Sequence, residues 1–577
     1  MFVRLTKSKT SRNPTVQIVE SYREGKKVRQ RVISSLGVVR SEEDRERLVN
    51  VGHALINKLR SEAKGQLGLP GIEREVAAPQ KKRDFVHPKN LVHVRDIPNG
   101  FEDVYGSLLE KIGFDGLLGE IDLNSRRDFS VRDVIRMIVR RRLEEPVSKR
   151  RSLFLETLEK DVSPCELHQV YRAMDAIEPY SDGFQKLAYN AAVNLLHQKV
   201  ECFFYDATTL YFESVLQDSV RDFGYGKDGK FNQVQCLFVL VVTEAGVPVG
   251  YEVFSGKTHE TSTFKIAIEA LSKRFDIAKI TIVCDRGMLS KGNLDFAENE
   301  KKMYFIVGAK LRQLKKEFHY LIFDKSAYSA FGEVLIREVP HPTRKDSRLI
   351  LCFSEKRARK DKRDRERLLK KLRARIEKKK KSSPEDFISN RGVKKYIEVS
   401  GGSVTLSAEA IAREEKWDGY FGIVSNHPLL TAPELLSHYR GLWQVESTFR
   451  VAKHDLRTRP IFHWSPHRIK AHILICFIAL VLERTLEVIL TQRGTPLTIT
   501  NIFDALRPCK KIIFQDKATS RLFEMESNKP VEAKKIYEAL GLHWRKETRE
   551  LPNPEGNVVS SSESVIPESL GIPGDHL

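Results

Sequence analysis

At residues 201–206 the chain reads Glu-Cys-Phe-Phe-Tyr-Asp, and this stretch decides the prediction of the fold. A short apolar and aromatic run between polar neighbours is typical of a buried strand, which here ends at a carboxylate. Runs of the same kind follow at 236–242, 247–254 and 280–284, and a helical pattern at 263–274 lies between the last two. Three successive strands, a helix and a further strand predict an α/β sheet with an antiparallel, hairpin-connected part.

The amino-terminal part is predicted to hold a hairpin and a helical region. Residues 16–22 and 28–36 are rich in valine and isoleucine and flank a turn-like segment, and a polar linker follows to about residue 99. From 101 to about 199 the pattern is helical, with a capping box at Ser130 and Asp133. The helix that begins there carries a series of arginines: Arg132, Arg136, Arg140, Arg141 and Arg142. Two interpretations stay open for this helix, a solvated basic face or a DNA-binding surface.

A second strand-rich region follows residue 311. The stretches 334–339, 348–353, 396–399 and 404–406 are interpreted as strands of a separate small sheet. Between them, residues 356–381 hold sixteen Lys or Arg against four Asp or Glu. Apolar residues recur every four positions in this run, which predicts a helical arm, either solvated or in contact with DNA.

The last third of the chain returns to strands and helices. A strand at 420–424 precedes a long predicted helix at 431–454, which begins with a capping box of Thr431 and Glu434. A very apolar helix is predicted at about 467–490, and the tail from Pro552 is expected to be disordered.

The balance of charged residues points to a polyanionic partner. The 577 residues include 98 Lys and Arg against 77 Asp and Glu, a formal net charge of +21, so nucleic acid is the first candidate. The longest apolar run, 473–482, has ten residues, whereas about 20 are needed to cross a bilayer. We therefore expect a cytoplasmic protein with no membrane contact. The seven cysteines are spread singly and are interpreted as core residues.

Two predicted strands are each followed by an aspartate, Asp206 and Asp285. A single aspartate after a strand is usually a turn former or a helix cap. Two of them in one α/β sheet favour an active site, because such sites gather at the carboxyl ends of strands. Thr208 and Thr209 are expected to orient the first aspartate.

The predicted helix at 431–454 adds a third carboxylate, Glu446. It falls on one helical face with mainly apolar residues, namely Leu435, Tyr439, Leu442, Phe449 and Lys453. A carboxylate buried in such a stripe needs a partner, either Arg450 one turn on or a metal ion.

Three carboxylates that converge on one sheet edge suit two divalent cations about 4 Å apart. Oxygen-only ligands favour Mg²⁺ or Mn²⁺ over zinc. His463 and His467 are a weaker metal pair, because no third ligand stands at a suitable spacing. His259 and Glu260 are a further acidic candidate, for which a loop role is the favoured interpretation.

Three ordered motifs resemble a known family. Residues 205–209 (Tyr-Asp-Ala-Thr-Thr), 284–288 (Cys-Asp-Arg-Gly-Met) and 439–450 (Tyr-Arg-Gly-Leu-Trp-Gln-Val-Glu-Ser-Thr-Phe-Arg) resemble the acidic motifs of DDE transposases from bacterial insertion sequences. The last resembles the branch with a Y-x2-R-x3-E-x6-K signature, in which Tyr439, Glu446 and Lys453 stand at the tyrosine, glutamate and lysine positions. Leu442 stands at the arginine position, so Arg440 and Arg450 are the candidates to replace that DNA contact.

The resemblance implies a ribonuclease-H-like catalytic domain interrupted by a β-rich insertion. The interval from Asp206 to Asp285 is 79 residues and that from Asp285 to Glu446 is 161, which leaves room for it. We expect six parts: a hairpin and linker (1–100), a helical DNA-binding region (101–199), the first catalytic part (200–310), the β-rich insertion with a basic arm (311–416), the second catalytic part (417–505) and a carboxyl-terminal region (506–577).

The resemblance also implies an activity. Asp206, Asp285 and Glu446 would hold two Mg²⁺ or Mn²⁺ ions and catalyse DNA cleavage and strand transfer at the terminal inverted repeats of an insertion sequence. Tyr439, Arg440, Arg450 and Lys453 would contact DNA, and the protein would act near the bacterial nucleoid as a homodimer or higher oligomer. Two alternatives stay open, a non-catalytic DNA-binding regulator derived from a transposase and a metal-dependent nuclease without strand transfer.

Overall fold

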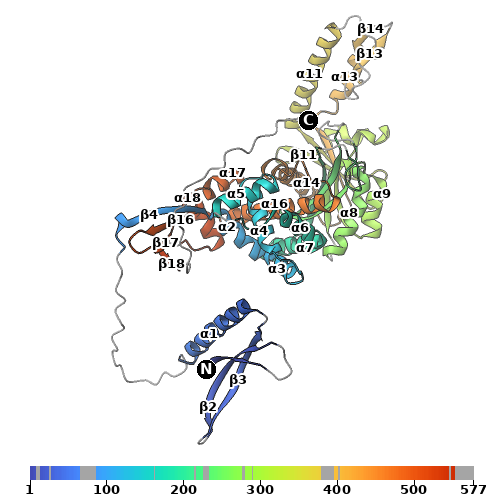
Figure 1. Ribbon diagram of the computed structural model, residues 1–577. Coiled ribbons are helices and arrows are strands. Elements are labelled where there is room, and N and C mark those ends of the chain that lie inside the picture. The colour runs from blue at the N-terminus through green and yellow to red at the C-terminus, as the bar shows by residue number, and fades with distance from the viewer. Residues whose placement is uncertain are drawn as a thin grey trace, which may run out of the picture. The chain divides into compact units, whose positions relative to one another are not determined.

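The computed structural model (Figure 1) divides the chain into two compact units, residues 1–85 and 86–577, which we describe separately. The structure describes residues 1–7, 13–24, 27–39, 41–64, 86–160, 163–213, 216–224, 233–275, 280–288, 290–378, 395–400, 403–544 and 547–552. Part of the predicted linker, at 65–85, and most of the predicted disordered tail, at 553–577, lie outside this description. The prediction of a linker is wrong for residues on either side of 65–85, which form a helix at 42–64 and a strand at 91–98.

The first unit is a three-stranded antiparallel sheet with one helix. Strand β2 (Thr15–Glu24) pairs with β1 (Phe2–Thr6) on one side and with β3 (Lys27–Val38) on the other. Helix α1 (Glu42–Lys64) packs on this sheet, and Val16, Ile18 and Val19 are fully buried. The predicted hairpin is therefore confirmed, with the additional strand β1 at its edge.

The centre of the second unit is a nine-stranded mixed sheet. One end of it follows the predicted order: β5 (Cys202–Tyr211), β6 (Gln235–Val242) and the edge strand β7 (Pro248–Ser255) run antiparallel. Helix α8 (Glu260–Phe275) then leads to β8 (Thr281–Cys284), which is parallel to β5, and β9 (Tyr304–Gly308) is parallel to β8. The predicted α/β sheet with an antiparallel part is confirmed.

The prediction of a separate small sheet in the second strand-rich region is wrong for its first two strands. Strands β11 (Val334–Pro340) and β12 (Arg348–Ser354) belong to the large sheet, with β10 (Ser329–Phe331) at its edge and β15 (Tyr420–Ser425) between β12 and β9. Strand β12 is buried almost throughout, as expected of a strand that lies inside the large sheet, between β11 and β15.

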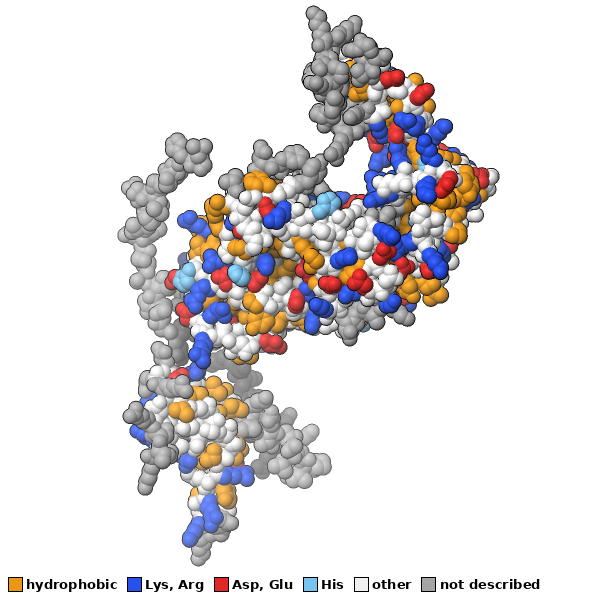
Figure 2. Space-filling view, turned by 90° about the vertical axis from the view of Figure 1, so that its right-hand side faces the viewer, with side chains coloured by type: hydrophobic (Ala, Val, Ile, Leu, Met, Phe, Trp, Pro, Cys, Tyr) orange, Lys and Arg blue, Asp and Glu red, His pale blue; other side chains and the backbone are white. Residues whose placement is uncertain are grey.

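Only the end of that region forms its own small sheet. Strands β13 (Ile397–Ser400) and β14 (Ser403–Leu406) pair with each other next to helix α13 (Ala408–Glu415). The predicted basic helix is α11 (Glu355–Lys378), and its Leu369 and Leu372 pack with Tyr396 in a small core. Figure 1 shows these elements as an arm on the large sheet, and Figure 2 shows Lys and Arg side chains where the arm joins it.

The predicted helical region is confirmed as a layer of six helices, α2 (Gly100–Ile112), α3 (Phe114–Leu123), α4 (Val131–Glu144), α5 (Lys149–Lys160), α6 (Leu167–Ile177) and α7 (Ser181–Asn190). The predicted apolar helix is α16 (Pro466–Gln492), which is buried over most of its length and packs against α4, α6 and β7 (Figure 1). No helix in the described parts of the chain is long and apolar enough to cross a membrane.

The interpretation of the basic helix α4 as a solvated face is wrong for three of its arginines. Arg136 donates to Asp115 and to Glu102 at 2.7 Å each. Arg140 and Arg141 are 7% and 2% exposed and pair with Glu156. These guanidinium groups pair with carboxylates of neighbouring helices, and DNA binding by the helical region stays a prediction.

The carboxyl-terminal region returns to a strand of the predicted linker. Strand β4 (Leu91–Pro98) pairs with β16 (Lys510–Asp516) in a four-stranded antiparallel sheet with β17 (Leu522–Glu526) and β18 (Arg549–Leu551). Helices α17 (Ile499–Leu506) and α18 (Val531–Leu540) pack together and complete this end of the unit.

Candidate active site

The register of two parallel strands places Asp206 and Asp285 at equivalent positions. The last pair between β5 and β8 is Tyr205 with Cys284, so each aspartate is the next residue on its strand. Adjacent strands lie about 4.8 Å apart. The two carboxylates therefore follow the same row of the sheet, as the sequence predicts.

Asp206 does not lie at the end of its strand, which is a correction to the predicted position. Strand β5 continues to Tyr211 and pairs Asp206 with Leu240 of β6. The neighbouring strand β8 is the one that stops, at Cys284. The flank of β5 that faces β8 thus loses its pairing partner from Asp206 onward.

Main-chain donors hold both carboxylates. The amide of Ala207 donates to Asp206 Oδ1 at 2.8 Å, and the amide of Arg286 donates to Asp285 Oδ1 at 2.7 Å. Burial raises the pKa of the Cys284 thiol, and the negative charges of Asp285 and Asp206 raise it further. Both aspartates therefore lie close enough to the buried Cys284 thiol to affect its pKa.

The predicted helix at 431–454 is broken. Helix α14 (Ala432–Arg440) ends at Gly441, α15 (Trp443–Arg450) begins two residues later, and a π-helical turn, η10 (Val451–Asp455), follows. A Cβ on Gly441 would lie 2.5 Å from the ring of Phe204 on β5. Because glycine has no Cβ, the main chain between α14 and α15 can lie close to β5, the strand that carries Asp206.

The break changes the environment of Glu446. Val445, Thr448 and Phe449 form the buried face of α15 against β5 and β6, while Glu446 is exposed. The prediction of a buried carboxylate in an apolar stripe is therefore wrong. Within the described residues no ion pair joins Glu446 to Arg450, and the carboxylates of Asp206, Asp285 and Glu446 do not form a group within 4.8 Å.

Lys453 and Tyr439 both reach the row of the two aspartates. The ammonium of Lys453 donates to the hydroxyl of Thr208, two residues beyond Asp206 on β5. Tyr439 is half-buried, and burial raises its pKa to about 12, with a further contribution from the charge of Asp285. Arg440 and Arg450, in contrast, are exposed on the surface of α14 and α15.

A cleft of about 1020 Å³ opens beside Asp285 and Tyr439. Its walls carry basic side chains and several carboxylates, and some of these pair internally: Arg365 lies 2.5 Å from Asp418, and Arg312 lies 2.6 Å from Glu414. Arg286 and Arg357 also line it. Of the three predicted catalytic carboxylates, Asp285 lines this cleft, whereas Asp206 and Glu446 do not.

Glu260 approaches the same place from the first turn of α8, although a loop role was the favoured interpretation. Burial is the largest cause that raises the pKa of Tyr205. The charges of Cys284, Asp206 and Glu260 raise it further, in that order. A Cβ on Gly287, two residues beyond Asp285, would lie 4.0 Å from Glu260 Oε2. The signal in the sequence was an acidic residue directly before a predicted helix, and its proximity to Asp285 depends on the packing of α8.

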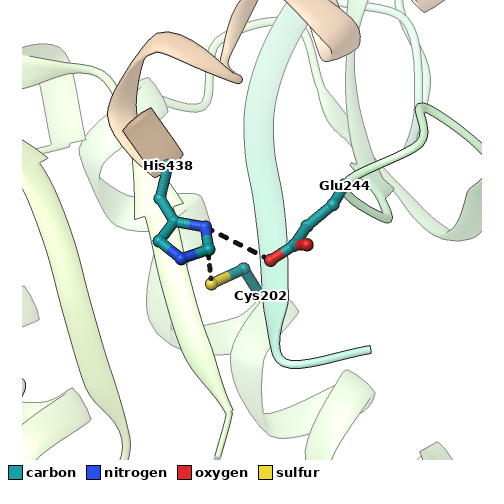
Figure 3. A group of neighbouring side chains, drawn as sticks. All are labelled: Cys202, Glu244 and His438. Atoms are coloured by element: carbon teal, nitrogen blue, oxygen red, sulfur yellow. Dashed lines mark hydrogen bonds and ion pairs between the residues drawn. The ribbon is translucent and has the colours of Figure 1, made fainter. Parts of the chain in front are cut away.

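A second group of titratable residues lies at the opposite end of β5. Figure 3 shows Cys202, Glu244 and His438, whose ligand atoms lie within 4.8 Å of one another. His438 Nδ1 is 3.2 Å from Glu244 Oε1 and 3.6 Å from Cys202 Sγ. The hydrogen bond from His438 is the main cause that lowers the pKa of Glu244, so an ion pair accounts for the contact. It fastens α14 to the turn between β6 and β7.

The two histidines considered as a metal pair have different neighbours. The ring of His463 lies 5.2 Å from that of His472. His467 Nδ1 lies 3.6 Å from Glu178 on the surface. Within the described residues, the grouping that suits a metal includes neither of them.

Comparisons with known proteins agree with the family that the sequence resembles. Residues 198–482 match the family model described as Transposase DDE domain, and residues 3–67 match the model described as IS1634 family transposase, N-terminal domain. No curated protein matches the chain. A solved structure titled "Cryo-EM structure of piggyBac transposase synaptic complex with hairpin DNA (SNHP)" is similar at 10% identity and a TM-score of 0.34, over 72% of this chain and 83% of that one.

Proposed function

Because the chain is a DDE-type transposase of the bacterial insertion-sequence kind, we propose that it binds the terminal inverted repeats of its element and catalyses DNA cleavage and strand transfer. The observation that carries this proposal is the register of β5 and β8, which sets Asp206 and Asp285 side by side. Glu446, on the helix that packs against β5, is the third catalytic residue.

DDE transposase domains depend on divalent cations, and the donor set of this site fits Mg²⁺ or Mn²⁺. Asp206, Asp285 and Glu446 offer only carboxylate oxygens, which hard cations prefer. When bound, a pair of such ions supplies a nucleophilic oxygen and stabilises the leaving oxygen. Glu446 is exposed in the free protein, so we propose that its carboxylate swings towards the aspartates when the ions and DNA bind.

The remaining residues position the DNA. Tyr439 lies in the cleft beside Asp285, where a phenol donates to a phosphate oxygen or supports a base. Lys453 offers an ammonium next to the strand of Asp206 and holds a phosphate as a point charge. The basic arm of α11 lines the same cleft through Arg357 and contributes sequence-independent attraction to the flanking DNA.

The fold of the catalytic part follows from the same strands. We propose that β5, β6, β7, β8 and β9 with α8 form a ribonuclease-H-like core, supported by their order in the sheet and by the parallel pairs of β5 with β8 and β8 with β9. The segments between β9 and β15 are then the insertion. A homodimer or higher oligomer would bring two element ends together.

The test is cleavage of labelled end DNA in Mg²⁺ by the wild type and by Asp206→Asn, Asp285→Asn and Glu446→Gln. We expect loss of cleavage with retained binding of end DNA, because an amide is a poor ligand for a hard cation. Asp128→Asn is the matched control, since its side chain is 70% exposed. Wild-type cleavage by Asp285→Asn would refute the site, and hydrolysis without joining to target DNA would favour the nuclease alternative.

A further inference from the structure

A cavity of about 330 Å³ lies apart from the carboxylates, between the helical layer and the segment that follows η10. Arg142 at the end of α4 and Lys149 at the start of α5 line it. Arg457 and Arg459, and His472 of α16, line it as well. Arg142 Nη1 donates to the main-chain oxygens of Leu456 and Arg457, at 3.2 and 3.3 Å, and so joins α4 to the segment after η10.

The lining of this cavity is cationic. Five basic side chains face it, together with two histidines, namely Arg142, Lys149, Arg150, Arg457, Arg459, His463 and His472. Among the described residues that line it there is no aspartate or glutamate. The neighbouring arginines of α4, Arg140 and Arg141, pair with Glu156 on the other side of the helix, so that carboxylate is already engaged.

Among the described residues, two buried cationic side chains at this place each hold a nitrogen with no hydrogen-bond partner. They are Lys149 Nζ and Arg142 Nε. Lys149 is only 4% exposed and Arg142 6%. Charged groups are rarely buried without a partner, because removal from water strongly disfavours the charged form. Their convergence on one cavity indicates a missing anion.

The protonation of the cluster supports this interpretation. Burial, together with the charge of Arg142, lowers the pKa of Lys149 to about 7. Burial lowers the pKa of His463 to about 3, with repulsion from Lys149 and Arg142 adding to the effect. An anion bound in the cavity would attract the charged forms of Lys149 and His463 and would so offset their repulsion by neighbouring cations.

We propose that this cavity binds the phosphate group of a nucleotide, with Lys149 and Arg142 as its buried cationic ligands. Arginine guanidinium groups match two phosphate oxygens at once, and a lysine adds a point charge. The aromatic rings of Tyr171 and Phe462 at the rim suit an attached base. The volume is that of a small-ligand pocket and excludes a duplex.

In the framework of the proposed function, the nucleotide belongs to a bound DNA strand. Ile461, beside the cavity, forms an isolated parallel bridge with Phe212, the residue after the end of β5. Phe212 is six residues beyond Asp206, or about 20 Å at 3.3 Å per residue. At 3.4 Å per step, this is on the order of six nucleotides from the cutting site. The cavity would thus hold a phosphate at a set distance from the bond that is cut.

The test begins with thermal unfolding of the full-length protein without divalent ions, which separates phosphate binding from cleavage. We expect inorganic phosphate to raise the melting temperature of the wild type more than chloride does at equal ionic strength. Deoxyadenosine monophosphate should act at lower concentration than inorganic phosphate, and uncharged deoxyadenosine should have no effect. Equal effects of phosphate and chloride on the wild type would overturn the proposal.

Two variants test the assigned ligands. Lys149→Met should melt at a higher temperature than the wild type in phosphate-free buffer, because it removes an unpaired buried charge, and it should no longer respond to phosphate. Lys186→Met, at an exposed position of α7, is the control and should behave as the wild type. If Lys149→Met does not fold, Arg459→Gln, at the half-exposed rim, should weaken the response at least several-fold. A full phosphate response in the variant that folds would refute the assignment.

The source of the phosphate is decided with end DNA. If a DNA strand fills the cavity, Lys149→Met should reduce the slope of log affinity against log salt by about 1, and free nucleotide should compete with DNA for the wild type. An unchanged slope in Lys149→Met, with a phosphate response that the wild type shows and the variant has lost, would assign the cavity to a free nucleotide. Asp285→Asn should leave every one of these results unchanged, so failure of the proposed function and failure of this inference are distinguishable.

Discussion

The ammonium of Lys453 donates a hydrogen bond to the hydroxyl of Thr208, and this contact joins the π-helical turn after α15 to the strand that carries Asp206. Thr208 is 5% exposed and lies on the same face of β5 as Asp206, two residues away. Lys453 is therefore directed into the site rather than into solvent. It has two possible tasks there, binding a phosphate and holding the strand.

Replacement of Lys453 by alanine separates these tasks. We expect single-turnover cleavage of bound end DNA to fall by about tenfold or more, because one charge-assisted phosphate contact is worth about 1.5 to 3 kcal/mol. Thr208→Val removes the contact but keeps the ammonium, so it should cleave nearly as the wild type if Lys453 binds phosphate. Lys470→Ala, at an exposed position of α16, is the control. An unchanged rate in Lys453→Ala would remove this residue from the site.

Replacement of Glu260 by glutamine tests whether a fourth carboxylate supports the ions. Its position near Gly287 and Asp206 predicts a weaker ion site, so the Mg²⁺ concentration for half-maximal cleavage should rise several-fold. Binding of Mn²⁺ measured by calorimetry should weaken in parallel. Glu269→Gln, exposed on the same helix, should change neither quantity. Unchanged Mn²⁺ affinity in Glu260→Gln would show that this residue only begins the helix.

Glu483 gives a pH dependence of stability with a definite sign. It is fully buried in α16, where Tyr105 donates to it at 2.5 Å, and burial raises its pKa from 4.5 to about 8. A raised folded pKa means that the folded state binds the proton more tightly. The contribution of Glu483 is therefore fully present below about pH 4.5 and is lost as the pH rises towards 8.

Glu483→Gln should remove this loss, since the amide stays neutral at every pH. We expect the variant to gain on the order of a few kcal/mol of stability relative to the wild type between pH 5 and 9. Chemical unfolding at several pH values measures it, with exposed Glu538→Gln as the control. Parallel pH profiles for the wild type and Glu483→Gln would contradict the expectation.

Some of the site was readable because its determinants are local. The length and residue types of the apolar runs predicted β5, β6, β7 and β8, with Asp206 and Asp285 directly after apolar runs of one α/β sheet. The parallel pairing of β5 with β8 comes from the structure. The capping box of Thr431 and Glu434 marked the start of α14 correctly. Each of these signals depends on residues within one strand or one helical turn.

The environment of Glu446 was not readable in this way. Helical spacing predicted a buried carboxylate on a continuous helix, but the helix is broken at Gly441, which lies close to Phe204, 237 positions away, and Glu446 is exposed. The spacing argument assumes one unbroken helix. A packing contact between distant segments removed that assumption.

The sequence by itself determined the strands and helix from β5 to β8, the helical region and the family, and it offers Asp206, Asp285 and Glu446 as candidate carboxylates, because short-range periodicity and side-chain chemistry are local properties of the sequence. Tertiary structure decided how charge is distributed. It paired Arg136 with Glu102 and Asp115 from other helices, and it left Lys149 buried without a partner. The physical reason is that the free energy of a charged group depends on its neighbours in space and on its exposure to water, and neither is a property of the local sequence.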